Sequence, residues 1–131
     1  MPGPDELVFV YGTLKRGGEY HRIMADAGAR LIGTGKLLQR YPLLLARYPC
    51  LIDKPGSGYQ VSGEIYSIPD ASSWRSLDWL EGHPDEYLRR IEPVQVNGET
   101  HQAWTYFFLD PDSLPQGLSP VEEFPIPSEQ G

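Results

Sequence analysis

Hydrophobic residues along this chain gather in short runs, and such runs predict β-strands rather than long helices. Residues 7–11 (LVFVY) are apolar, β-branched or aromatic and precede a glycine, which is typical of a buried strand. Apolar stretches of extended character follow at residues 30–38 and 42–46. Turn-forming residues are dense at 54–58 (KPGSG), so we expect the chain to reverse direction there.

The next strand, predicted over residues 59–68, has the alternation of a sheet that is covered on one face. Val61, Gly63 and Ile65 point to one side of this strand, and Glu64 points to the other. We therefore expect Glu64 to face solvent or to pair with an arginine.

Two further segments have the spacing of short amphipathic helices. Residues 19–27 carry apolar side chains at helical intervals and meet Gly28, which can end a helix. In the second segment, Asp70 can cap the free amide groups of the first turn and Gly82 can end the helix. The sequence therefore predicts a second helix over residues 70–81.

A β-hairpin is predicted around Asn97-Gly98, which is the strongest short hairpin signal and lies between strand-forming runs at 87–96 and 100–109. Several strands with only two main short helices indicate the α+β class. A small mixed, antiparallel-rich sheet that curls into a β-barrel would leave no open edges. From Pro111 onward the chain is rich in proline and acidic residues and has no periodicity, so we expect a domain over residues 1–110 and a surface-bound or mobile tail over 111–131.

The composition narrows the range of functions. The chain has 131 residues, the length of one ordinary domain, and its net charge is −7. So acidic a chain is poorly suited to bind nucleic-acid phosphate, and we expect a small-molecule or protein partner instead. No apolar segment approaches the roughly 20 residues that cross a bilayer, and the first residues lack the pattern of a secretory signal. We expect a cytoplasmic protein, and the sequence leaves its oligomeric state open.

Several familiar catalytic motifs are absent from the sequence. Gly12 and Gly17 have the glycine spacing of a phosphate-binding loop, but Gly18 and Glu19 stand where that loop needs a lysine and a hydroxyl group. The three histidines are scattered and no Gly-x-Ser-x-Gly motif occurs, so we expect neither a zinc site nor a serine nucleophile. The single cysteine, Cys50, has apolar neighbours and is expected to serve packing.

Glu81 is the leading candidate for acid/base chemistry. Trp74, Leu77 and Glu81 lie on one stripe of the predicted second helix, so a stripe that begins with two large apolar residues ends in a carboxyl group. The partial negative charge of the helix end and partial burial both raise the pKa of such a carboxyl. A carboxyl tuned toward neutrality suits a group that must accept and return a proton. The pattern equally allows a solvent-facing Glu81, and Asp78 on the same face is the rival carboxylate.

Six stretches of the sequence match one known family, in the family's order along the chain. They are FVYGTLKRG at 9–17, His21-Arg22, YPLLLA at 41–46, PGSG at 55–58, VSGEIY at 61–66 and LDWLEGHPDEYLRR at 77–90. On these motifs the chain resembles the γ-glutamylcyclotransferase-like superfamily, and within it most closely the γ-glutamylamine cyclotransferases. The opening loop combined with the Leu-Asp-x-x-Glu helix end and the following Tyr-x-Arg is specific to that family.

The resemblance implies a small β-barrel with helices packed on it and a reaction that uses no cofactor and no metal. In that reaction a γ-glutamyl compound cyclises to 5-oxoproline and releases an amine. The resemblance places the catalytic glutamate at Glu81 and a substrate-binding tyrosine at Tyr87. It also implies that backbone amides hold the γ-glutamyl group in a loop, which here consists of Tyr11, Gly12, Thr13 and Leu14.

Other residues and other functions stay open at this point. Tyr106, in the second strand of the hairpin, is a weaker candidate for substrate binding, and Lys15 and Arg16 could attract a substrate carboxylate. The leaving group could be an amine, as in γ-glutamyl-ε-lysine, or an amino acid or the remainder of glutathione. The domain could instead be a binding module without turnover, although holding a ligand does not require a base at Glu81. A β-barrel interaction protein with an incidental acidic residue is the third possibility.

Overall fold

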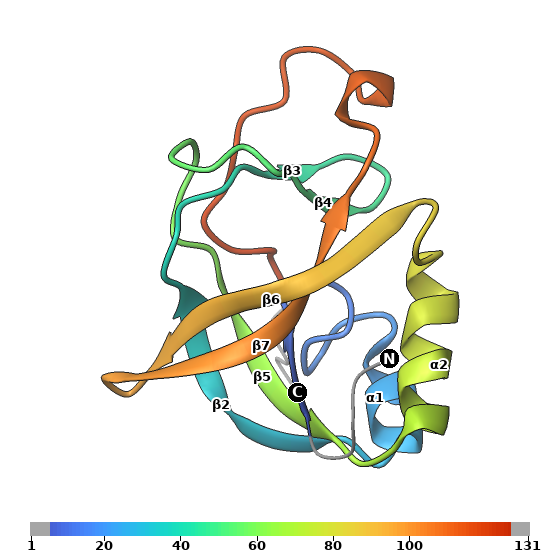
Figure 1. Cartoon of the computed structure of the whole chain (residues 1–131). Coiled ribbons are helices and arrows are strands. Elements are labelled where there is room, and N and C mark those ends of the chain that lie inside the picture. Colours follow the sequence, from blue (N-terminus) through green and yellow to red (C-terminus); the bar gives the residue numbers. More distant parts are fainter. Residues whose placement is uncertain (1–5, 127–131) are drawn as a thin grey trace, which may run out of the picture.

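The computed structural model describes residues 6–126 and shows a closed five-stranded barrel with helices on one side (Figure 1). The barrel strands are β1 (Glu6–Val10), β2 (Arg30–Leu37), β5 (Ser62–Ile68), β6 (Tyr87–Val96) and β7 (Glu99–Phe108). The remaining elements are α1 (His21–Asp26), β3 (Leu43–Leu45), β4 (Pro49–Leu51), α2 (Ala71–Glu81) and a 3₁₀ turn (Pro111–Ser113). The predicted α+β class and barrel are confirmed.

The barrel closes in the strand order β1-β5-β2-β6-β7. All neighbouring pairs are antiparallel except β1 and β7, which run parallel and place Val8 opposite Trp104. The sheet is therefore mixed and antiparallel-rich, as the sequence predicts. The short strands β3 and β4 pair with each other in a separate two-stranded sheet beyond one end of the barrel (Figure 1), and Leu43 of β3 also bridges to Val121. The sequence gives no strand signal for β4, which has three residues and begins with a proline.

The hairpin predicted at Asn97-Gly98 is present. Asn97 has a φ of 50° and Gly98 a φ of 81°, so both central residues adopt the left-handed conformation that a two-residue hairpin turn requires. Strands β6 and β7 pair along their whole length from this turn, with Val96 opposite Glu99 next to it and Tyr87 opposite Phe108 at the far end.

Helix α2 begins and ends as its sequence predicts. The Asp70 side chain accepts a hydrogen bond from the backbone N–H of Ser73 at 2.8 Å and so caps the helix. Gly82 ends the helix with a φ of 66°, which a glycine adopts without strain. These two caps place Glu81 in the last turn. No helix in the described part of the chain has the length and hydropathy to cross a bilayer.

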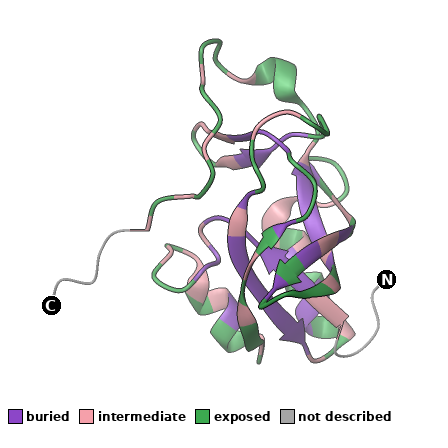
Figure 2. Cartoon of the chain, turned by 90° about the vertical axis from the view of Figure 1, so that its left-hand side faces the viewer, coloured by how far each residue is buried: buried purple, intermediate pink, exposed green. Residues whose placement is uncertain are grey.

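Strand β5 is buried on both faces, which the alternation of its sequence does not predict (Figure 2). One face, with Ile65, packs into the hydrophobic cluster that fills the barrel. The other face, with Tyr66, packs into a second cluster that also contains Met24 of α1 and Trp74 of α2. Glu64 pairs with Arg16 of the loop that follows β1 and is only 7% exposed, so the expectation that it faces solvent is wrong. Its pairing with an arginine is confirmed below.

Residues 114–126 run back along the barrel after the 3₁₀ turn (Figure 1). The backbone N–H of Val121 donates to Leu43 at 3.0 Å, and that of Ser62 donates to Glu122 at 2.9 Å. Lys15 is 4% exposed and donates to the carbonyl of Phe124 at 2.9 Å. The described part of the tail is therefore bound to the barrel, while the division between residues 1–110 and 111–131 stays a prediction.

Candidate active site

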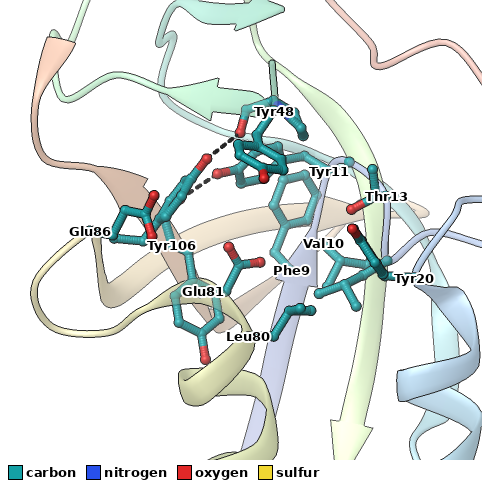
Figure 3. A pocket seen from close by; sticks show the side chains of 14 residues that line it. Phe9, Val10, Tyr11, Thr13, Tyr20, Tyr48, Leu80, Glu81, Glu86 and Tyr106 are labelled. Atoms are coloured by element: carbon teal, nitrogen blue, oxygen red, sulfur yellow. Dashed lines mark hydrogen bonds between the residues drawn. The ribbon is translucent and has the colours of Figure 1, made fainter. Parts of the chain in front are cut away.

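A pocket opens where the end of β1 meets the end of α2 (Figure 3). Its cavity volume is about 180 Å³, which suits a small molecule or one end of a larger one. It is lined by Phe9, Val10, Tyr11, Gly12, Thr13, Leu14, Tyr20, Tyr48, Pro49, Leu80, Glu81, Glu86, Tyr87 and Tyr106. All seven site residues predicted from the sequence are in this lining, although they come from four separate segments of the chain.

The loop after β1 brings backbone amide groups to the pocket. The N–H groups of Gly12, Thr13 and Leu14 donate to no acceptor within residues 6–126. A side chain at Gly12 would place its Cβ 2.5 Å from Cγ of Pro49, so only glycine lets these two segments approach. Free amide groups beside a cavity are suited to bind an anion or a developing negative charge.

A buried carboxylate holds the far side of this loop. Glu64 accepts a hydrogen bond from the backbone N–H of Arg16 at 2.9 Å and another from its Nε at 3.1 Å. The Tyr66 hydroxyl donates to the same carboxylate at 2.8 Å. Burial disfavours the ionised form of Glu64, but these hydrogen bonds outweigh burial and keep its pKa below the ordinary value. Arg16 is thus engaged by Glu64, and Lys15 by the tail, so neither cation lines the pocket.

Glu81 projects from the last turn of α2 into the pocket (Figure 3). Its pKa is raised from 4.5 to about 7, first by burial and then by the negative charge of Glu86. The carboxyl group forms no hydrogen bond within the described residues. At neutral pH both its protonated and its ionised forms are therefore well populated, as a group that accepts and returns a proton requires.

Asp78, the rival carboxylate, is committed to a different partner. It accepts two hydrogen bonds from Arg89, at 2.8 and 2.9 Å, and one from the Tyr106 hydroxyl at 2.6 Å. Burial opposes its ionisation, but Arg89 and Tyr106 prevail and hold its pKa below the ordinary value. A carboxylate held ionised and paired is poorly suited to accept protons, and Asp78 does not line the pocket.

The three tyrosines of the predicted site build the pocket walls. The Tyr11 hydroxyl donates to the carbonyl of Tyr106 at 2.7 Å, and the Tyr87 hydroxyl donates to the carbonyl of Pro49 at 2.8 Å. The Tyr106 hydroxyl is held by Asp78. Burial raises the pKa of all three, so they are neutral at physiological pH. Their rings shape the cavity while their hydroxyl groups bind other parts of the protein.

Cys50 lies behind the pocket wall rather than in it. Its Sγ is 3.3 Å from the carbonyl oxygen of Tyr48 and 3.6 Å from the Tyr87 hydroxyl. Burial raises its pKa, so the thiol stays protonated and has little nucleophilic character. Within residues 6–126 no group of three or more His, Cys, Asp or Glu is arranged to hold a metal ion.

Sequence reasoning missed several lining residues, among them four that are exposed or half-buried and so mark the pocket mouth, namely Tyr20, Tyr48, Pro49 and Glu86. Tyr48 and Pro49 lie at and before the short strand β4, for which the sequence has no signal. Glu86 follows α2 in a turn and looks like an ordinary surface residue. Only the pairing of segments far apart in the chain reveals these contributions.

This chain is similar to known proteins over most of its length. The family model described as gamma-glutamyl cyclotransferase, AIG2-like, matches residues 8–125. A putative gamma-glutamylcyclotransferase of Drosophila melanogaster is 38% identical over 115 residues, covering 82% of this chain and 73% of the relative. The gamma-glutamylaminecyclotransferase of Homo sapiens is 43% identical over 96 residues, covering 69% of this chain and 62% of the relative.

The fold has a close counterpart among solved structures. The crystal structure of an AIG2-like protein from Mus musculus superimposes with a TM-score of 0.84 at 34% identity, covering 93% of this chain and 89% of that one. The family match extends well past residue 110, so the described part of the tail is included in it.

Proposed function

Because this chain belongs to the gamma-glutamyl cyclotransferase, AIG2-like family, we propose that it converts a γ-glutamylamine, such as γ-glutamyl-ε-lysine, into 5-oxoproline and a free amine. Glu81 is the general acid/base of this proposal. The observation that carries it is a carboxyl group with a pKa of about 7 in the same small pocket as three free backbone amides.

The first half of the reaction needs a base. The α-amine of the substrate is normally an ammonium ion, and its nitrogen can attack the γ-carbonyl carbon only after losing a proton. Ionised Glu81 accepts that proton, and the C–N bond that forms closes a five-membered ring. Intramolecular attack of this kind gains an effective molarity of about 10⁵ to 10⁸ M when the reactive conformer is held. The rings of Tyr11, Tyr87 and Tyr106 line the pocket, and this lining supports the proposal that the reactive conformer of the substrate is held.

The second half of the reaction needs an acid. The protonated Glu81 gives its proton to the departing nitrogen as the original amide C–N bond breaks, and the amine leaves. One carboxyl group thus serves both steps, a role typically worth about 10² to 10⁴ in rate. Asp78 could not take the role without losing its hydrogen bonds to Arg89 and Tyr106.

The loop after β1 supplies the electrostatic part of the proposal. Negative charge develops on the γ-carbonyl oxygen during the attack, and N–H groups of Gly12, Thr13 and Leu14 are free to donate to it or to the substrate carboxylate. These groups are oriented before the reaction, because Pro49 packs against Gly12 and Glu64 holds Arg16.

A substrate that releases an amino acid or the remainder of glutathione is the second candidate within the same chemistry. A binding module without turnover is the third, and the raised pKa of Glu81 argues against it because binding alone gains nothing from a poised proton.

The test is incubation with γ-glutamylamines, γ-glutamyl amino acids and glutathione, followed by measurement of 5-oxoproline. We expect turnover of a γ-glutamylamine and a loss of at least about a hundredfold in kcat for Glu81→Gln. Because glutamine has the shape of the protonated carboxyl, circular dichroism should show an unchanged fold. Full activity in Glu81→Gln would refute the role of Glu81, and no product from any substrate would favour a binding module.

A further inference from the structure

Glu86 presents a carboxylate at the pocket that the proposed chemistry does not use. Its side chain is exposed and has neither an ion pair nor a hydrogen bond within the described residues. Its backbone is nevertheless fixed, because its N–H donates to Gly82 at 2.8 Å and its carbonyl accepts from Leu109 at 3.1 Å. The side chain packs over Gly82, where an added Cβ would lie 2.9 Å from Oε2 of Glu86. The backbone of Glu86 is thus fixed, and its carboxylate lies over Gly82 without a cationic partner among the described residues.

The pocket contains no positive side chain to balance this charge. Among its fourteen lining residues are two carboxyl groups, Glu81 and Glu86, and no Lys, Arg or His. Arg16 binds Glu64 and Arg89 binds Asp78. Arg47 lies outside the lining, with its guanidinium 5.7 Å from the ring centroid of the lining residue Tyr48. A concave site lined by charge of one sign attracts ligands of the opposite sign and repels those of the same sign. Repulsion between the two carboxyl groups is also one cause of the raised pKa of Glu81.

The geometry sets which end of the substrate meets Glu86. In the proposed reaction the γ-glutamyl end lies between Glu81 and the amides of residues 12–14, which all line the pocket. The departing group then extends toward the mouth. Glu86 and Glu81 lie on the same side of the pocket in Figure 3, opposite Thr13 and Tyr20. The exposed Glu86 therefore faces the departing group rather than the γ-glutamyl group.

We infer that Glu86 is a specificity-determining residue, which favours substrates whose departing amine carries a second, positively charged nitrogen and disfavours those whose departing group carries a carboxylate and no such nitrogen. This inference rests on the proposed function. It assigns Glu86 no part in bond making or breaking, only an electrostatic contact with the far end of the leaving group. A carboxylate at the mouth would meet a negative charge with no cation among the lining residues to offset it.

Three γ-glutamyl amides of similar length test the inference. Their amines are diaminobutane, pentylamine and aminobutanoate, so the far end of the leaving group is positive, neutral or negative. The readout is the ratio of kcat/KM between two substrates on the same enzyme. This ratio cancels any effect of a Glu86 variant on the acid strength of Glu81, because that effect acts on all three substrates.

We expect the native protein to prefer the diaminobutane compound, and Glu86→Gln to reduce its preference over the pentylamine compound by about two- to fivefold, the range of exposed charge pairs. Glu86→Lys should invert the order and favour the aminobutanoate compound. Asp85→Asn removes the same charge from an exposed neighbour outside the pocket lining and should leave the ratios unchanged. Added salt should weaken the native preference.

Three results would overturn the inference and are distinguishable from one another. Turnover with the same charge preference in the native protein, Glu86→Gln and Glu86→Lys would overturn the role of Glu86 alone. Absence of 5-oxoproline from all three substrates with the native protein would overturn the proposed function, and the role of Glu86 with it. An equal change in Asp85→Asn would also count against Glu86, because it would show a general surface-charge effect.

Discussion

Replacing Glu81 by glutamine should stabilise the fold at neutral and alkaline pH while it removes the proposed acid/base group. The pKa of Glu81 is raised from 4.5 to about 7 by burial and by the charge of Glu86. A difference of this size between the folded and unfolded chains corresponds to about 3 kcal/mol, since one pKa unit is worth roughly 1.4 kcal/mol. Glutamine has the shape of the protonated carboxyl and carries no charge, so the variant is free of this penalty.

The sign and the pH window follow from proton binding. Between pH 4.5 and about 7 the folded chain keeps a proton on Glu81 that the unfolded chain has lost. The free energy of unfolding therefore falls as the pH rises through this window, and the whole penalty is present above it. Asp78 has the opposite behaviour, because its pKa is lowered in the fold. Its contribution to stability is present at neutral pH and is lost as the pH falls through its folded pKa.

Urea unfolding of the native protein and Glu81→Gln at about pH 4 and about pH 8 measures the effect. We expect similar stabilities at the lower pH and a variant that is more stable by about 3 kcal/mol at the higher pH. Asp78→Asn is the matched control on the same helix and should destabilise the protein at neutral pH, with a smaller deficit in acid. A difference between the native protein and Glu81→Gln that is the same at both pH values would refute the assignment of a raised pKa to Glu81.

Three further outcomes are expected. With a γ-glutamylamine, kcat/KM should rise with pH through about 7 as Glu81 ionises. It should fall again at higher pH as the substrate ammonium loses its own proton. A profile without the rising limb would contradict the role of Glu81 as the base. Gly12→Ala should lower kcat/KM by about 10- to 100-fold and destabilise the fold by about 1 to 3 kcal/mol, because its Cβ would lie 2.5 Å from Cγ of Pro49 and displace the amide loop. Native kinetics in this variant would show that the loop does not bind substrate. Glu64→Gln should lower the free energy of unfolding in urea by about 1.5 to 3 kcal/mol, because the hydrogen bonds to Arg16 lose their charged acceptor. An unaltered urea midpoint would show that these hydrogen bonds make no net contribution to stability.

Local signals predicted the elements that rest on a few neighbouring residues. The Asn97-Gly98 turn determines a hairpin on its own, because two left-handed positions in a row suit few other residues. The caps at Asp70 and Gly82 determine the ends of α2, and its apolar stripe then turns Glu81 inward. The helix pattern allowed both an inward and a solvent-facing Glu81, and the structure places the side chain in the pocket. Its chemical role remains the proposal above.

Features that depend on distant segments could not be read from the sequence. The alternation around Glu64 predicts an exposed side chain, but Glu64 is buried and binds Arg16, which lies 48 positions earlier in the chain and which no local pattern connects to it. The burial of Lys15 could not be predicted for the same reason, because its partner, the carbonyl of Phe124, belongs to the distant tail. The helix-end charge and partial burial were expected to raise the pKa of Glu81; burial is the larger cause in the structure, and Glu86 adds a charge that the sequence did not reveal.

The parallel pairing of β1 with β7 has a consequence for how the protein acquires activity. The pocket straddles this seam, where the hydrogen bond from Tyr11 to Tyr106 joins residues 95 positions apart. Contacts of such long sequence separation carry a high closure entropy and are the slowest to form. An early intermediate that contains only the β6–β7 hairpin has half a pocket wall and no amide loop beside it. Substrate therefore cannot guide the early stages of folding, and we expect a refolding chain to regain catalysis only when its first and last strands meet.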